Sequence, residues 1–141
     1  MYLLDTDTVI YALKGQPEVL RNLALHADDP LGVSVITLME LHHGAFGSRQ
    51  VAGNLAKVRS LEKAVQVWDL EADAAEVFGA LKAELESDGS RRGRGGRLDD
   101  FDLGIAACAL VHNLTLVSHR SAQFSRVRGL RLDDWCTAPS D

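Results

Sequence analysis

The sequence predicts an α/β fold, with three α/β/α layers and a parallel sheet in the centre. Short β-branched and apolar runs alternate with longer segments whose apolar residues recur at helical spacing, which is typical of a parallel sheet with helices on both faces. The 141 residues are 46% hydrophobic and 25% charged, the composition of an ordinary globular protein. A chain of this length buries enough apolar surface for one core, so we expect a single domain over residues 1–141.

Five short segments are predicted as strands of this sheet. The first is an apolar run that ends at Asp5, and the second is a β-branched run that follows the turn sequence Asp28-Asp29-Pro30. Three further apolar runs of strand length occur later in the chain. The predicted strands cover residues 2–4, 31–36, 65–70, 114–118 and 130–132.

Helices are predicted between these strands. Apolar residues recur at helical spacing over residues 51–61, over residues 77–85 and, with mostly small side chains, over residues 105–110. A helix is also expected directly after each of the first two strands. Residues 87–97 read SDGSRRGRGGR, and their glycines and arginines predict a loop.

The charge of the chain is unevenly distributed. The formal net charge of −5 excludes a polycation that coats nucleic acid. Residues 1–90 carry 7 Lys/Arg and 14 Asp/Glu, whereas residues 91–141 carry 8 Lys/Arg and 6 Asp/Glu. All eight of the later cations are arginines, the side chain suited to bidentate phosphate contacts.

Cysteine usage and hydropathy bear on the compartment. The two cysteines, Cys108 and Cys136, form no CxxC pair, which excludes a disulfide framework and fits a reducing environment. The first residues, MYLLDTDT, lack the basic segment of a signal peptide. No apolar run approaches the roughly 20 residues that span a bilayer. We therefore expect a cytoplasmic protein with no membrane partner.

Three acidic residues fall at the ends of predicted elements. Asp5 directly follows the first strand, Glu40 lies just after the second, and Asp102 opens the helix of small residues. A parallel sheet brings such ends together, and converging carboxylates repel one another unless a cation lies between them. Carboxylate oxygens suit Mg²⁺ or Mn²⁺, ions that neutralise phosphate charge and generate a hydroxide nucleophile.

Glu40 and Asp102 also have structural interpretations as helix-capping residues. Glu40 would be the acid of a capping box that begins at Thr37. Asp100 or Asp102 would cap the helix of small residues. Taken singly, neither acid requires a metal ion.

Asp5 is harder to explain as a capping residue. Either Asp7 or Thr8 is expected to cap the helix that follows the first strand. An acid at the end of a buried strand is then left with no obvious local backbone partner. This position favours a functional role for Asp5.

Four stretches of the chain together resemble a known family. They read LLDTDTVIYALKG, SVITLMELHHGA, DLGIAACAL and LTLVSHRSAQFSRVRGLRLDDW, in that order. Over nearly the whole length, from Tyr2 to Trp135, their order and spacing resemble those of PIN-domain ribonucleases, specifically the VapC toxins of VapBC toxin–antitoxin modules.

The resemblance implies a function and a set of partners. Members of this family are Mg²⁺-dependent endoribonucleases, and Mn²⁺ is a possible substitute for Mg²⁺. Their metal-holding acids fall on Asp5, Glu40 and Asp102, which would therefore be the catalytic residues here. The resemblance also implies an RNA substrate, a cognate VapB-type antitoxin and a homodimer. Antitoxins of this kind place a basic side chain in the acidic groove of the toxin.

The chain departs from the family pattern at several positions. The usual fourth acid, which precedes a phenylalanine, is replaced by Gln123. A neutral amide lowers the negative charge, so weaker binding of a second metal ion, or none, is expected. Asp7 stands where relatives often carry asparagine, and Ser118 stands where they carry threonine. Thr6, Asp7, Ser118 and Gln123 are expected around the metal ligands rather than among them.

Basic residues in the second half of the chain are candidate contacts for RNA phosphates or for an acidic partner. Some cluster in the predicted loop, and others follow the predicted strand over residues 114–118. These residues are Arg91, Arg92, Arg94, Arg97, His119 and Arg120.

Two alternative functions are retained. The opening LLDTDTVI also fits a haloacid dehalogenase-type phosphatase, with Asp5 as nucleophile and Asp7 as general acid. Against it, the later motifs come in the wrong order, and Lys82 is the last lysine of the chain. The second alternative is a catalytically weak or inactive PIN-like protein that binds RNA or an antitoxin, and Gln123 is its only support.

Overall fold

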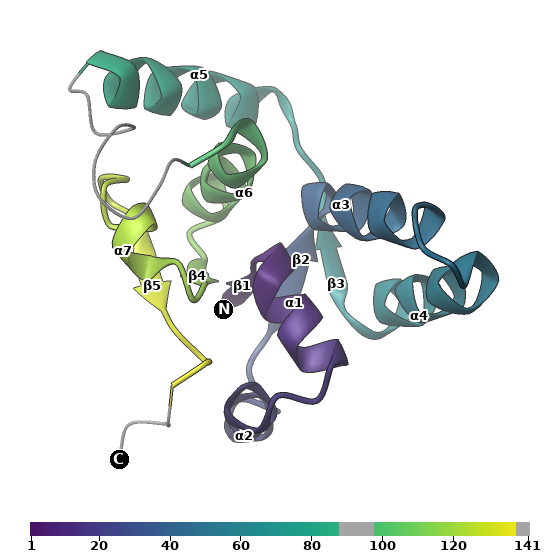
Figure 1. Ribbon diagram of the computed structural model, residues 1–141. Coiled ribbons are helices and arrows are strands. Elements are labelled where there is room, and N and C mark those ends of the chain that lie inside the picture. Colours follow the sequence, from purple (N-terminus) through teal and green to yellow (C-terminus); the bar gives the residue numbers. More distant parts are fainter. Residues whose placement is uncertain (88–97, 138–141) are drawn as a thin grey trace.

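The computed structural model describes residues 1–87 and 98–137. Its centre is a parallel five-stranded sheet in the order β3-β2-β1-β4-β5, which confirms the predicted fold class (Figure 1). The register places Leu3 of β1 between Gly32 of β2 and Leu116 of β4. The strands are β1 (Tyr2–Leu4), β2 (Leu31–Ser34), β3 (Gln66–Trp68), β4 (Thr115–Val117) and β5 (Arg131–Asp133).

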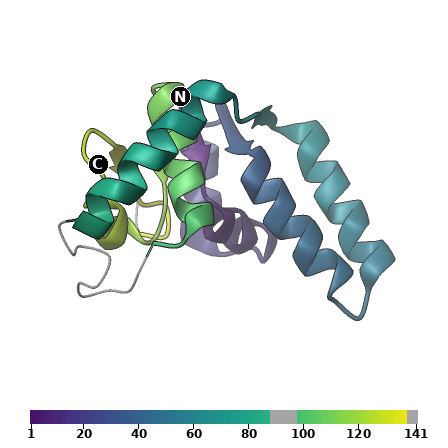
Figure 2. The ribbon, with the colours of Figure 1, turned by 90° about the horizontal axis from the view of Figure 1, so that it is seen from above.

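Helices cover both faces of the sheet and form the outer layers (Figure 1). They are α1 (Thr6–Leu13), α2 (Pro17–Leu25), α3 (Val35–Phe46), α4 (Val51–Ala64), α5 (Ala72–Ser87), α6 (Asp100–Val111) and α7 (Ser121–Phe124). Helices α5 and α6 pack on each other, whereas α3 and α4 form an antiparallel pair that extends away from the sheet (Figure 2). Within the described residues, no helix is long and apolar enough to cross a membrane.

The core lies on both sides of the sheet because side chains alternate along each strand. Leu3 and Leu116 belong to a cluster with residues of α5, α6 and α7. Leu4 and Val117, one position further along the same strands, belong to a second cluster with α1, α3 and α4. Small side chains predominate in the buried part of α6, which allows this helix to lie close to the sheet. The sheet is thus a rigid base for the residues that follow its strands.

The second strand is shorter than predicted. It ends at Ser34 rather than at residue 36, because the Ser34 hydroxyl accepts a hydrogen bond from the Ile36 amide (3.1 Å) and caps α3. The β-branched pair Val35-Ile36 therefore begins a helix. The last strand lies one residue later than predicted, and the third and fourth lack one or two residues at each predicted end.

Two helices were not predicted. Helix α2 begins at Pro17, a position where proline is favoured because the first helical amide needs no intrahelical partner. Helix α7 is a single turn that ends at Phe124, whose buried ring anchors it in the core. The predicted loop over residues 87–97 lies outside the described residues except for Ser87, which is the last residue of α5. The candidate contacts in that loop, Arg91 to Arg97, lie outside the described part as well.

Candidate active site

The candidate site lies beyond the carboxyl ends of β1 and β4. From β1 the chain continues to β2 and β3 on one side of the sheet, and it then returns to form β4 and β5 on the other side of β1. The strand order therefore reverses between β1 and β4. In open parallel sheets such a point opens a crevice in which ligands bind. Asp5 follows β1 and Ser118 follows β4, and the Asp5 amide donates to the Val117 carbonyl (3.0 Å). Thr8 reinforces this junction by donating its hydroxyl to the same carbonyl (3.2 Å).

Asp5 is the N-cap of α1. Its carboxylate accepts a hydrogen bond from the Thr8 amide (2.9 Å), so the expectation that Asp7 or Thr8 is the cap is wrong. The absence of a local backbone partner for Asp5 was also a wrong expectation. The residue is 5% exposed, and this burial raises the pKa of its carboxyl, although hydrogen bonds with Ser118 and Thr8 oppose the shift. A buried, oriented carboxylate thus stands at the end of β1.

Glu40 is held beside Asp5 by the residue that follows Asp5 in the chain. The Thr6 hydroxyl donates to the Glu40 carboxylate (2.6 Å) and also lies 3.1 Å from the buried hydroxyl of Thr37. Burial raises the pKa of Glu40, the Thr6 hydrogen bond lowers it, and nearby acids that include Asp5 raise it further. Because Ser34 caps α3, the expected Thr37–Glu40 capping box is absent from this described helix, and Glu40 lies in its second turn.

Asp102 reaches the site from the first turn of α6. It forms a capping box with Asp99: the Asp102 amide donates to the Asp99 carboxylate (2.8 Å), and the Asp99 amide donates to the Asp102 carboxylate (3.0 Å). The N-cap is therefore Asp99, and not Asp100 or Asp102. Arg120 Nη1 also donates to the Asp102 carboxylate (2.8 Å). Burial raises the pKa of Asp102 to about 6, although the Asp99 amide and Arg120 lower it.

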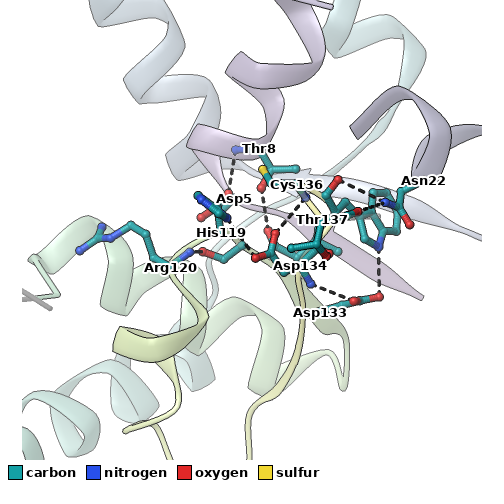
Figure 3. Close-up of polar contacts among 12 residues, drawn as sticks. Asp5, Thr8, Asn22, His119, Arg120, Asp133, Asp134, Cys136 and Thr137 are labelled. Atoms are coloured by element: carbon teal, nitrogen blue, oxygen red, sulfur yellow. Dashed lines mark hydrogen bonds and ion pairs between the residues drawn. The ribbon is translucent and has the colours of Figure 1, made fainter. Parts of the chain in front are cut away.

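Ser118 and Arg120 connect Asp102 with Asp5. The Arg120 amide donates to the Ser118 hydroxyl (2.9 Å), and Ser118 is in turn hydrogen-bonded to Asp5. Arg120 was a candidate contact for RNA or for an acidic partner, and the structure places its guanidinium on Asp102 (Figure 3 shows Arg120 extending away from Asp5). Asp5 and Asp102 are thus linked through Ser118 and Arg120. Glu40 is held separately by Thr6, the residue after Asp5, and lies close enough to Asp5 to feel its charge.

The donor chemistry of these acids fits a hard divalent cation. Three carboxylates, with the hydroxyls of Thr6 and Ser118 beside them, present oxygen atoms only, as Mg²⁺ requires. Within the described residues, the three acids do not form a group whose oxygens all lie within 4.8 Å of one another. Holding an ion with all three would therefore require side-chain movement.

The remaining predicted site residues lie around these acids. Asp7 is exposed on the first turn of α1, and it adds negative charge near Glu40. Gln123 lies half-buried in α7. His119 was a candidate contact for RNA or for an acidic partner, and its Nδ1 lies 3.0 Å from the carboxylate of Asp134.

Several residues of the site were missed by sequence reasoning. The Asp99–Asp102 spacing is a detectable capping signal, since it repeats the pattern of a capping box with aspartate at both positions. Nothing in the sequence indicates the pairs of His119 with Asp134 and of Arg120 with Asp102, because these contacts join segments 15 and 18 residues apart through the fold.

Comparisons with known proteins agree on one family. Residues 2–130 match the model of the PIN domain. The chain is 34% identical to the tRNA(fMet)-specific endonuclease VapC of Salmonella typhimurium, across 96% of this chain and 98% of that protein. It is 36% identical to ribonuclease VapC2 of Haemophilus influenzae, across 95% and 97% of the two chains.

Solved structures agree with the sequence comparisons. The structure of VapBC2 from Rickettsia felis bound to a promoter DNA fragment matches with a TM-score of 0.84 and 30% identity, covering 95% of this chain and 98% of that chain. DNA-bound VapBC from Salmonella typhimurium matches with a TM-score of 0.84 and 32% identity, covering 96% and 98%. The chain therefore belongs to the PIN-domain family, in the branch whose members are named VapC.

Proposed function

We propose that this protein is a Mg²⁺-dependent endoribonuclease and the toxin of a toxin–antitoxin module. The observation that carries the proposal is the gathering of three acids around the end of β1: Asp5 follows that strand, Glu40 is held by the adjacent Thr6, and Asp102 is linked to Asp5 through Arg120 and Ser118. Relatives that align over nearly the full chain are named ribonuclease VapC or tRNA(fMet)-specific endonuclease VapC. The reaction is hydrolysis of an RNA phosphodiester bond by water.

Asp5, Glu40 and Asp102 are the residues that would hold Mg²⁺, and Mn²⁺ would substitute for it. When bound, the ion would supply a lowered water pKa and positive charge against the phosphate. The protein's own contribution is orientation. Thr8 and Ser118 fix the Asp5 carboxylate, and the Thr6 hydroxyl fixes that of Glu40. No covalent enzyme intermediate is required.

Arg120 has a positioning role in this proposal. Its guanidinium holds the Asp102 carboxylate, and its amide is fixed by Ser118 beside Asp5. A positive charge at this place offsets part of the repulsion between the acids and an approaching phosphate. Asp7, which is exposed nearby, adds negative charge in place of the usual asparagine.

The proposed partners are RNA, a VapB-type antitoxin and a second copy of the chain. The solved relatives are described as VapBC complexes, which supports an antitoxin partner. The acids around Glu40 would attract a basic antitoxin side chain. Both cysteines are free thiols, which suits action in the reducing cytoplasm.

The decisive experiment is incubation of total RNA with the purified protein and its Asp5→Asn variant, in Mg²⁺, Mn²⁺ or EDTA. The proposal predicts discrete fragments that require both the metal and Asp5, and mapping of the fragment ends would identify the target. Absence of cleavage by folded, metal-loaded protein would favour the binding-only alternative, with Gln123 as the first position to examine. Family membership disfavours the phosphatase alternative, and release of phosphate from small phosphomonoesters would revive it.

A further inference from the structure

A second cluster of metal-ligating side chains lies beside Asp5, beyond the ends of β4 and β5. His119 follows β4, and Asp134 and Cys136 follow β5, the neighbouring strand. One ligand atom from each residue lies within 4.8 Å of the other two. Among residues 1–87 and 98–137, no other three His, Cys, Asp or Glu side chains are gathered so closely. Figure 3 shows the three side chains converging beside Asp5.

The cluster is already partly organised. His119 Nδ1 lies 3.0 Å from one carboxylate oxygen of Asp134, while the other oxygen accepts the Cys136 amide (2.9 Å). In a tetrahedral zinc site with ordinary bond lengths, neighbouring N, O and S ligand atoms are about 3.3 to 3.6 Å apart. The distances between the three ligand atoms are all within 4.8 Å, so reaching the tetrahedral spacing needs shifts of at most about 1.5 Å, which side-chain rotation supplies.

The segment that carries two of these residues is firmly anchored. Trp135, between Asp134 and Cys136, is 1% exposed and stacks on His26. The Asn22 side-chain amide donates to the carbonyls of Trp135 (3.2 Å) and Thr137 (3.1 Å). The backbone positions of Asp134 and Cys136 are thus set by the core, independently of any ion.

The surroundings of the cluster favour a cation. Asp5 and Asp7 lie close enough to Cys136 to act on its thiol electrostatically, as does Asp134. The Tyr11 ring stands edge-on to His119, 6.3 Å away, and offers no positive charge. Nitrogen, oxygen and sulfur donors together match Zn²⁺, whereas Mg²⁺ takes oxygen ligands only.

We propose that His119, Asp134 and Cys136 form a Zn²⁺ site distinct from the carboxylate centre of Asp5, Glu40 and Asp102. Three protein ligands leave the fourth tetrahedral position for water or another small ligand. The ion would tie the chain after β4 to the chain after β5, at the border of the candidate active site. This site does not depend on the proposed ribonuclease activity.

The test is a titration of the metal-free, full-length protein with Co²⁺, a spectroscopic substitute for Zn²⁺. We expect one equivalent of Co²⁺ to produce a thiolate-to-metal charge-transfer band, and one equivalent of Zn²⁺ to abolish it. Cys136→Ser should lose the band. Cys108→Ala, which alters the buried thiol in α6, is the matched control and should keep it. Asp5→Asn should also keep it, because Asp5 belongs to the other centre.

The exposed His119 provides a second test that leaves the core intact. His119→Ala should weaken Zn²⁺ affinity at least about tenfold in competition with a chelating dye, with an unchanged circular dichroism spectrum. The proposal is overturned if wild type shows no thiolate band, if the band survives in Cys136→Ser, or if it disappears in Asp5→Asn. Unchanged Zn²⁺ affinity in His119→Ala would contradict it equally.

Discussion

Replacement of Asp102 by asparagine should stabilise the metal-free protein at neutral pH. Burial raises the pKa of Asp102 from 3.8 to about 6, even though the Asp99 amide and Arg120 favour its ionised form. A shift of about 2 units, at about 1.4 kcal/mol per unit, means that the ionised carboxylate lowers the free energy of unfolding by about 3 kcal/mol. The side chain is 17% exposed, so solvent screens little of this effect. Since asparagine keeps one acceptor oxygen but loses the ion pair, we expect a net gain of about 1 to 3 kcal/mol.

The effect has a defined pH dependence. Because the folded-state pKa of Asp102 is raised, the folded protein binds this proton more tightly than the unfolded chain does. The stability that this proton confers is complete below about pH 4 and is lost as the pH rises through about 6. The gain from Asp102→Asn should therefore be largest above pH 7 and about 1.5 kcal/mol smaller at pH 5.

Urea unfolding in EDTA, followed by circular dichroism at pH 7.5 and pH 5, measures this difference. The matched control is Asp100→Asn, in the same first turn of α6. Its carboxylate is 57% exposed and pairs with Lys82 at 3.0 Å, so we expect a change within about 0.5 kcal/mol. If Asp102→Asn is less stable than wild type at pH 7.5, the capping box and Arg120 outweigh burial, and the reasoning is refuted.

Three further substitutions test the fold and the site. Gly32→Ala should destabilise the protein by about 1 to 3 kcal/mol, because the new methyl group meets the backbone of the adjacent strand. The control Gly53→Ala in α4, which has open space around it, should not destabilise the protein, and thermal unfolding compares the two variants. Thr6→Val removes the hydrogen bond to Glu40 and should slow RNA cleavage about tenfold or more, with little change in melting temperature. An unchanged cleavage rate would show that Thr6 has no role in the mechanism. Gln123→Glu adds a carboxylate and should lower the Mg²⁺ concentration needed for half-maximal cleavage; a higher requirement would contradict the role given to this position.

The sheet was predictable because its strands are short apolar runs separated by helical patterns. All five appear near their predicted positions, in one parallel sheet. The error at the end of the second strand occurs where a local hydrogen bond overrides residue propensity. Val35 and Ile36 favour a strand, yet the Ser34 cap begins a helix there.

The site was predictable only in part. Positions at element ends singled out Asp5, Glu40 and Asp102, but not the partners that orient them. The capping role of Asp5 depends on its extended backbone (φ −74°, ψ 172°), which spacing alone does not reveal. The contact of Arg120 with Asp102 joins two elements that meet only after the sheet has formed.

We propose above all that Asp5 is part of a metal-dependent centre for RNA hydrolysis. Its most direct test is the single-turnover cleavage rate of one defined RNA target by wild type and Asp5→Asn at saturating Mg²⁺, with Asp7→Asn as the exposed control from the same turn. Circular dichroism must first show that all three proteins are folded. We predict that Asp5→Asn falls to the background measured in EDTA, while Asp7→Asn retains most of its activity. Cleavage by folded Asp5→Asn at the wild-type rate would contradict the account.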